Sequence, residues 1–333
     1  MRRDSARHLD GESGMTLVEL MVAMLIGLLI VGGATATLVA NRQTYRINDN
    51  LARVQEAARI AFELMARDLR AAGGNGCARG IPTMSVLLPA QGASPAWWSW
   101  PGDGIRGFDG GDAFPAAAFG SADGARIAGT DAIVVHGAHG TGLSVESHNP
   151  PSAQFKVSRP NHGIRPDDVL MVCDYQQASI FQVTNADQVN RTIVHNTGTG
   201  SIGNCSKGLG FADPVVCTAN GTPKAYGPNS AIYRYNAKAW YIGASNAGRS
   251  LFSIELDGEP VEIAPGVHDM QITYLDGNGA YRNAAAIADW GDVRAVRIAL
   301  ILRANQHRDV TQASPERIDR VLAHNVTLRN RLP

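Results

Sequence analysis

The chain has 333 residues, with 30 basic and 30 acidic side chains, 44% hydrophobic residues, 36 glycines and 4 cysteines. This composition is that of a globular protein of one or two domains, and it excludes a collagenous or wholly disordered chain. The net charge of zero argues against nucleic acid as a partner, because binding to a phosphate backbone needs clustered Lys and Arg.

An apolar segment begins close to the start of the chain. Residues 1–14 are polar, and residues 15–40 are apolar except for one ionisable side chain, Glu19. As a helix, residues 15–40 would measure about 39 Å at ~1.5 Å per residue, which is enough to cross a hydrocarbon core of about 30 Å. The sequence therefore predicts a membrane helix. A secretory signal peptide cleaved near Ala34–Ala36 is the alternative, but it leaves Glu19 unexplained.

The helical pattern continues through residues 41–74 as an amphipathic half. Apolar or small side chains recur three or four residues apart, as a buried helical stripe requires: Ile47, Leu51, Val54, Ala58, Ala61, Met65, Leu69 and Ala72. Gly73 and Gly74 are predicted to end the helix. Because no Pro lies between residues 15 and 72, we expect one continuous helix of about 58 residues.

Residues 75–130 have the composition of a long variable loop, rich in Gly, Ala, Ser and Pro. Trp97, Trp98 and Trp100 lie close together within it. One interpretation is a hydrophobic plug that folds the loop onto a sheet. The alternative is an exposed patch that contacts a partner protein or stacks on a glycan.

Strand patterns dominate residues 131–333. Segments of apolar or alternating character follow one another with short connections: 131–135, 169–175, 180–184, 232–235, 239–242, 251–256, 260–264, 270–275, 293–302 and 322–328. The dipeptide Asp257–Gly258 between two of these segments is typical of a hairpin turn. The pattern predicts an α+β domain in which residues 47–72 pack on one face of an antiparallel β-sheet.

The sequence offers no convincing catalytic or metal site. Residues 198–203 fit the pattern GxGxxG, but no helix-forming segment follows them, as a dinucleotide site would need. Residues 276–279 begin like a calcium loop, and Ile287 stands where a bidentate Glu belongs. His136 and His139 are three residues apart in or after a strand and are expected on opposite faces. We therefore predict a protein without catalytic activity, cofactor or metal.

The segment GMTLVEL, Gly14 to Leu20, resembles the processing motif of type IV prepilins. That resemblance implies that a prepilin peptidase cleaves after Gly14 and methylates Met15 as the new amino terminus. It also implies that Glu19 neutralises the terminal amine of a neighbouring subunit, since two charges that are costly alone in hydrocarbon become tolerable together. The family usually has Phe after the cleavage site, where this chain has Met15.

Further segments are similar to the PilW family of minor pilins: residues 41–46, 67–73, 266–274, 293–300 and 328–331. The resemblance covers the first 77 residues and most of residues 130–333. It implies a pilin-like fold with a long N-terminal α-helix, whose first half spans the membrane, packed on an antiparallel sheet.

The function implied by the resemblance is that of a minor pilin. Such a protein is anchored in the inner membrane with a periplasmic C-terminal domain and is then incorporated at or near the pilus tip. The implied partners are the prepilin peptidase, the major pilin, other minor pilins and a tip adhesin. A pseudopilin of a type II secretion system is the alternative within the same class of proteins. A membrane-tethered periplasmic binding protein or hydrolase is the alternative from another class.

The four cysteines, Cys77, Cys173, Cys205 and Cys217, would lie in the periplasmic part, where disulfides form. Four thiols allow three connectivities, which the sequence does not decide. We favour one bond from Cys205 to Cys217 within a short loop, and one from Cys77 to Cys173 between the end of the helix and the sheet. Free buried thiols are the alternative.

Overall fold

The computed structural model describes residues 16–74, 76–77, 80–91, 96–100, 102–198, 200–246, 248–256, 258–303 and 319–331. The chain divides into two compact units, Met1–Ala52 and Arg53–Pro333. One helix, α1 (Leu17–Ala71), begins in the first unit and ends in the second. Its continuity over 55 residues agrees with the absence of Pro from this part of the sequence.

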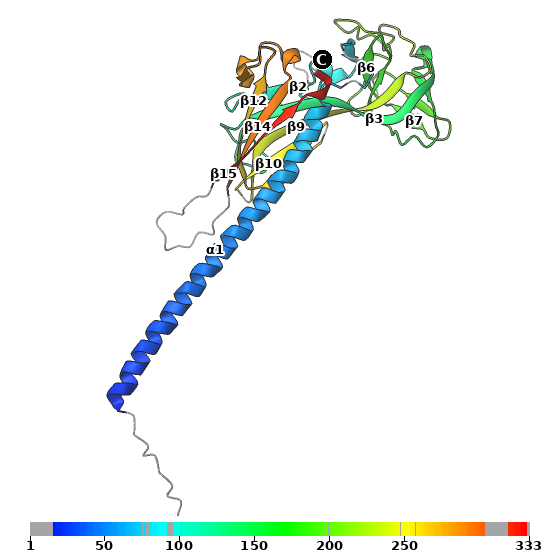
Figure 1. The fold of residues 1–333 in the computed structure, drawn as a ribbon. Coiled ribbons are helices and arrows are strands. Elements are labelled where there is room, and N and C mark those ends of the chain that lie inside the picture. The colour runs from blue at the N-terminus through cyan, green and yellow to red at the C-terminus, as the bar shows by residue number, and fades with distance from the viewer. Residues whose placement is uncertain are drawn as a thin grey trace, which may run out of the picture. The chain divides into compact units, whose positions relative to one another are not determined.

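The second unit contains two β-sheets (Figure 1). The larger sheet has eleven strands in the order β1-β6-β5-β9-β3-β4-β8-β7, with β2 paired to β3, β10 to β9 and β11 to β10. The smaller sheet has four strands in the order β13-β12-β14-β15. The strands are β1 (Thr83–Ser85), β2 (Ile105–Phe108), β3 (Ala132–Asn149), β4 (Gln154–Val157), β5 (Val169–Cys173), β6 (Ala178–Gln182), β7 (Asn185–Asp187), β8 (Thr192–Val194), β9 (Ala231–Ser245), β10 (Gly248–Glu255), β11 (Val261–Pro265), β12 (Val267–Leu275), β13 (Tyr281–Arg282), β14 (Ala295–Arg303) and β15 (Asp319–Thr327).

The two longest strands, β3 and β9, are neighbours at the centre of the larger sheet. They are antiparallel, with Ala132 opposite Tyr241 at one end and Ser144 opposite Ala231 at the other. Their register shifts between Gly140 and Leu143, a bulge that bends a long ribbon. The two halves of this ribbon consequently lie in different hydrophobic cores.

The first core is formed between α1 and both sheets. Buried side chains of α1 from Ala58 to Leu69, together with Ala72 just after the helix, pack on residues of β3, β9 and β10 from the larger sheet and of β12 and β14 from the smaller sheet. The C-terminal turns of α1 lie against β9, β10 and β14 in Figure 1. The second core is built mainly from the distal half of β3, from β4, β5, β6 and β8, and from the segment between Leu209 and Ile232.

The expected strands are present, but several expectations of detail were wrong. The segments 232–235 and 239–242 form one strand, β9, and residues 131–135 are only the start of the 18-residue β3. The helix packs on two sheets rather than on one face of a single sheet. Among the described residues one strand pair, β1 with β6, is parallel. Residues 75–130, expected as loop, contribute the short strands β1 and β2.

Candidate functional site

The start of α1 carries the predicted assembly carboxylate. Gly14 and Met15, where processing is predicted, lie outside the described residues. The main-chain N–H of Glu19 donates to Thr16 Oγ1 at 3.3 Å, so Thr16 caps the helix. Thr16 and Glu19 have the spacing of a capping box, S/T-x-x-E. This bond involves the main chain of Glu19, and its carboxylate keeps only the predicted role between subunits.

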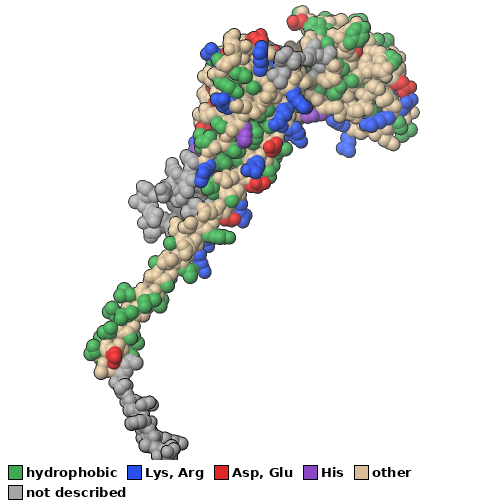
Figure 2. Space-filling model, in the orientation of Figure 1, with side chains coloured by type: hydrophobic (Ala, Val, Ile, Leu, Met, Phe, Trp, Pro, Cys, Tyr) green, Lys and Arg blue, Asp and Glu red, His purple; other side chains and the backbone are tan. Residues whose placement is uncertain are grey.

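The first unit exposes an apolar helix surface. Leu17, Leu28 and Leu29 are 75%, 77% and 68% exposed. Hydrophobic side chains cover the first turns of α1 on the visible face (Figure 2). By length and composition this helix could cross a membrane. Such a surface needs an apolar environment, either lipid or the packed helices of neighbouring subunits.

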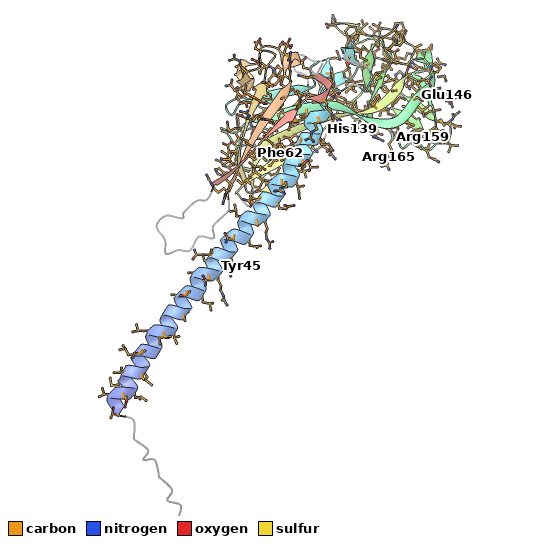
Figure 3. All side chains as sticks on the ribbon, viewed as in Figure 1. Tyr45, Phe62, His139, Glu146, Arg159 and Arg165 are labelled. Atoms are coloured by element: carbon orange, nitrogen blue, oxygen red, sulfur yellow. A yellow bond between two sulfur atoms is a disulfide. The ribbon has the colours of Figure 1, made fainter. Side chains whose placement is uncertain are left out.

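The last turns of α1, from Val54 onward, lie in a cradle formed by both sheets. The predicted stripe residues Ala58, Ala61, Met65, Leu69 and Ala72 are all at most 1% exposed. Phe62 extends from α1 toward β15, and its ring lies 4.2 Å from that of His324 (Figure 3). A side chain at Gly266 would approach Val54 within 2.9 Å, so the backbone before β12 contacts the helix closely.

One charged side chain lies on the buried stripe of α1. Asp68 is 4% exposed, and its Oδ2 accepts a hydrogen bond from Trp240 Nε1 at 3.2 Å. Lys238 Nζ lies 3.9 Å from Asp68 Oδ2 and 3.1 Å from Glu255 Oε1. Burial raises the pKa of Asp68 above its ordinary value, although Lys238 lowers it. The network joins α1 to β9 and β10, and it stabilises one rotational position of the helix on the sheet.

The end of α1 is held by the last described residues of the chain. Asn330 Nδ2 donates to the carbonyls of Ala71 and Ala72 at 3.3 and 3.1 Å. The N–H of Gly73, which has φ +69°, donates to the carbonyl of His136. These bonds satisfy main-chain groups that a helix end leaves unpaired. The segments 67–73 and 328–331, which resemble the PilW family, therefore contact each other.

The three tryptophans of the variable region pack onto the sheet. Trp98 is 7% exposed and shares a core with Met171 and Ile180, and Trp97 and Trp100 are partly buried against the same core. Tyr235 Oη donates to the carbonyl of Trp98 at 2.6 Å. This packing matches the plug interpretation, and it leaves Trp98 inaccessible to a partner.

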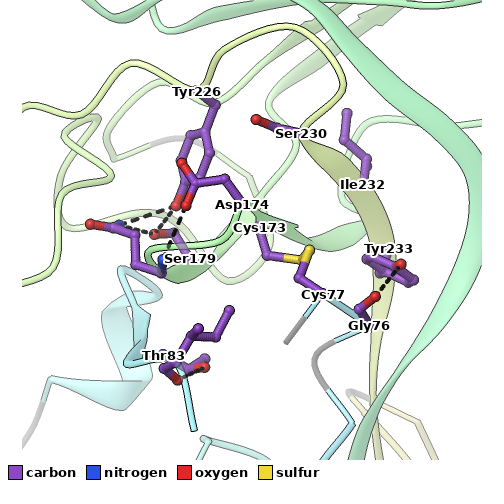
Figure 4. The surroundings of a disulfide bond; sticks show 12 residues. Gly76, Cys77, Thr83, Cys173, Asp174, Ser179, Tyr226, Ser230, Ile232 and Tyr233 are labelled. Carbon is purple, nitrogen blue, oxygen red and sulfur yellow. Dashed lines mark hydrogen bonds between the residues drawn. A yellow bond between two sulfur atoms is a disulfide. The ribbon is translucent and has the colours of Figure 1, made fainter. Parts of the chain in front are cut away.

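Both favoured disulfides are present. Cys77 is bonded to Cys173, and Cys205 to Cys217. The first disulfide ties the segment after α1 to the end of β5, and beside it Tyr233 Oη donates to the carbonyl of Gly76 (Figure 4). The second closes a short loop within residues 205–217.

The motifs that we set aside have structural roles here. Gly203 N–H donates to Gln182 Oε1, within a bend that no helix follows. Asp276 Oδ1 accepts from the N–H groups of Asn278 and Ala280, and its Oδ2 pairs with Arg282, so its carboxylate closes the turn between β12 and β13. Within the described ranges, no three His, Cys, Asp or Glu side chains converge as a group that could hold a metal.

His136 and His139 lie on opposite faces of β3, as predicted. His136 is 1% exposed and its Nδ1 lies 2.9 Å from Tyr235 Oη, whereas His139 is exposed. Because Tyr235 donates its proton to Trp98, Nδ1 of His136 must carry a hydrogen and donate to the Tyr235 oxygen. Burial lowers the pKa of His136 to about 3.

Sequence reasoning missed Asp68 and its partners, although a signal was present. Asp68 is three residues after Met65 and four before Ala72, which places a charge on the apolar stripe. A carboxylate at such a position needs a buried partner. Lys238, three residues after Tyr235 in a strand, gave no comparable signal, since its contact with Asp68 depends on the packing of β9 against α1.

The fold and the helix surface define a class of proteins. A long N-terminal helix, apolar in its first half, whose last turns pack on two largely antiparallel sheets is a pilin-like α+β architecture. Residues 239–330 match the family described as Type IV Pilus-assembly protein W, and residues 10–35 match the prokaryotic N-terminal methylation motif. The two matches confirm the suspected relationship to PilW-type pilins. No curated protein and no solved structure matches the chain.

The family match has a clear location in the fold. Residues 239–330 include the end of β9, strands β10 and β11, and the whole smaller sheet. These elements supply much of the cradle around the second half of α1. The chain is thus similar to type IV pilus-assembly proteins over these residues, and the matched region is the part that holds the end of the helix.

Proposed function

We propose that this protein is a minor pilin that is processed after Gly14 and incorporated at or near the tip of a type IV pilus, where it promotes assembly. The observation that carries the proposal is the combination of an N-terminal methylation motif with an apolar helix whose surface is exposed. In the membrane that surface contacts lipid, and in a filament it contacts the helices of other pilins. The globular unit remains on the periplasmic side before extraction.

Processing is tested by mass spectrometry of the mature amino terminus from cells with an active prepilin peptidase. We expect loss of residues 1–14 and an N-methylated Met15. Replacing Gly14 with Leu should block cleavage, because the peptidase must approach the backbone closely at that residue. Gly11→Leu, within the same leader, serves as the control and should be cleaved. Normal processing of the Gly14 variant, or an uncleaved native chain, would refute the assignment and favour a tethered periplasmic protein.

The role of Glu19 is tested by separating its charge from its capping geometry. Glu19→Gln keeps a side chain that suits a capping box and removes the negative charge. We expect membrane insertion to be retained, and the amount in sheared pili to fall because the amine of an adjacent subunit loses its counter-charge. Thr16→Val removes the cap and keeps the charge, and it should affect incorporation less. Equal incorporation of wild type and Glu19→Gln would remove the inter-subunit role.

The methylation motif equally suits a type II secretion pseudopilin. The two functions predict different phenotypes on deletion of the gene. A minor pilin is required for surface pili and twitching motility, whereas a pseudopilin is required for secretion of folded proteins. Loss of secretion with normal piliation would establish the alternative.

A further inference from the structure

Two histidines from distant parts of the chain meet at the edge of the second core. His148 lies near the end of β3, and His195 directly follows β8. Their Nε2 atoms are 3.2 Å apart. His195 is fully buried, and His148 is partly buried. Both rings pack on Phe155 of β4, with centroid separations of 3.9 Å for His148 and 5.0 Å for His195.

The surrounding hydrogen bonds fix the protons on both rings. The main-chain N–H of Tyr226 donates to His148 Nδ1 at 3.2 Å, so that nitrogen carries no proton. A neutral His148 must then carry its hydrogen on Nε2 and donate it to Nε2 of His195. His195 in turn carries its hydrogen on Nδ1, a buried atom without a hydrogen-bond partner in the described part of the chain.

This arrangement accommodates two neutral rings and no additional proton. A proton added to Nδ1 of His148 would face the Tyr226 N–H, so two donors would oppose each other. A proton added to Nε2 of His195 would likewise face the donor of His148. The same geometry disfavours a metal ion between the two Nε2 atoms, because His148 would then have to carry its hydrogen on Nδ1, toward the Tyr226 N–H.

The charged groups around the pair do not favour an imidazolium. Lys207, whose Nζ donates to the carbonyl of Pro151, opposes protonation of His195. Across Tyr226 lie Lys224 and Asp174, which pair with each other at 2.8 Å. Glu146, on the same strand as His148, pairs with Arg191. Among the described residues no carboxylate forms an ion pair with either histidine.

We propose that His148 and His195 form an acid-sensitive closure of the second core, which opens when either ring is protonated. Protonation separates the end of β3 from the end of β8 and releases the segment at Tyr226. The first core has no part in this contact, so opening is confined to β4, β7, β8 and the segment between Leu209 and Ile232. The consequence is that these strands and this segment become more accessible to solvent in mild acid.

The direction of the pH effect follows from linkage. Burial lowers the pKa of His148 to about 4, and burial together with His148 lowers that of His195 to about 3. In the opened state both rings return toward the ordinary histidine pKa of about 6.5. Closure is therefore fully stabilised above about pH 6.5 and is progressively lost as the pH falls below it.

The test is hydrogen exchange of the full mature chain in detergent, read by mass spectrometry at pH 7.5 and pH 5.5 and corrected for intrinsic exchange rates. The opening equilibrium for peptides covering β4 and β8 should rise about tenfold for each histidine, or about a hundredfold for the pair. Peptides covering β12 and β14 serve as the internal reference. An unchanged equilibrium in β4 and β8 would overturn the proposal.

Variants identify the residues responsible. The double variant His148→Gln with His195→Gln retains a donor at 148 and an acceptor at 195 but does not titrate, so the acid response should disappear. His139→Gln, an exposed position on the same strand, should leave the response intact. A double variant that keeps the full acid response would contradict the proposal.

A second measurement on the wild type covers the case in which the double variant does not fold. Nitrogen-15 chemical shifts at pH 7.5 should show His148 protonated only on Nε2 and His195 only on Nδ1. Any other tautomer pair, or an imidazolium at either position, at pH 7.5 would exclude the proposed closure.

Discussion

A single buried polar residue, Asp131, connects the two sheets. Asp131 is 7% exposed; its N–H donates to the carbonyl of Met270, and its Oδ2 accepts from the N–H of Ile272. It therefore joins the start of β3 in the larger sheet to β12 in the smaller one. Desolvation is the main reason that the pKa of Asp131 is raised to about 6, and the Ile272 N–H opposes this shift.

The raised pKa of Asp131 predicts a pH dependence of stability. At a pH between the pKa of Asp131 in the unfolded chain and its raised pKa in the folded protein, the folded state keeps a proton on this carboxyl group and the unfolded state does not. Stability should therefore fall as pH rises from about 4 to about 6, by at most about 3 kcal/mol for this group. Asp131→Asn keeps an acceptor for Ile272 and should flatten this segment of a urea-unfolding profile. If Asp123→Asn flattens it equally, Asp131 is not the group responsible.

The Asp68 network predicts a large cost for a small side-chain change. Asp68→Ala removes the partner of Trp240 Nε1 and one of the two carboxylates around Lys238. Because breaking a buried charged network leaves unpaired groups, we expect a loss of about 3 kcal/mol in the free energy of unfolding. Glu63→Ala, on the exposed face of the same helix, should change stability by less than about 0.5 kcal/mol. Similar small effects of both substitutions would show that the network is not stabilising.

At the scale of elements, the variable region is part of the fold. Its strand β1 pairs with β6, its strand β2 pairs with β3, and Trp98 shares a core with Met171 of β5 and Ile180 of β6. Trp98→Ala should therefore destabilise the second unit by about 3–5 kcal/mol in a denaturant melt. Tyr175→Ala, at a residue that is 82% exposed, is the control and should have little effect. An unchanged melt for Trp98→Ala would revive the interpretation of the tryptophans as a partner surface.

The two disulfides should differ in their contribution to stability. The Cys77–Cys173 bond spans 96 residues and the Cys205–Cys217 bond spans 12. Loop-closure entropy assigns about 4.7 kcal/mol to the longer loop and about 3 kcal/mol to the shorter one. Paired Cys→Ala variants compared by urea unfolding should therefore show the larger loss for Cys77 and Cys173. The reverse order would mean that residual structure or packing, rather than chain entropy, determines how much each disulfide stabilises the protein.

At the scale of the whole molecule, the two compact units predict different solubility. Residues 53–333 contain both sheets and their cores, whereas residues 17–40 are mostly exposed and apolar. A fragment that begins at Asn41 should therefore be soluble without detergent and melt within a few degrees of the full chain. The full chain should require detergent or lipid. A fragment that aggregates or is unfolded would show that the globular unit depends on the apolar half of α1.

The sequence alone determined the features that arise from local periodicity and chemistry. The apolar run, the amphipathic stripe and the glycines at residues 73 and 74 were sufficient for α1, because helix periodicity and a stop signal are local properties. The regular alternation after residue 293 likewise indicated β14. Cysteine spacing and the predicted position of the helix end suggested the two disulfides that the structure contains.

Tertiary structure decided how these elements combine. Contacts between residues far apart in sequence produce the division into two sheets and the parallel pairing of β1. They also produce the ion pair of Asp68 with Lys238 and the contact of His148 with His195. Short strands such as β1 and β8 carry too few residues for a periodic pattern, so they form because neighbouring strands offer unpaired main-chain groups. Local pattern therefore determined the helix and the longer strands, whereas long-range packing determined the sheet order and the buried polar contacts.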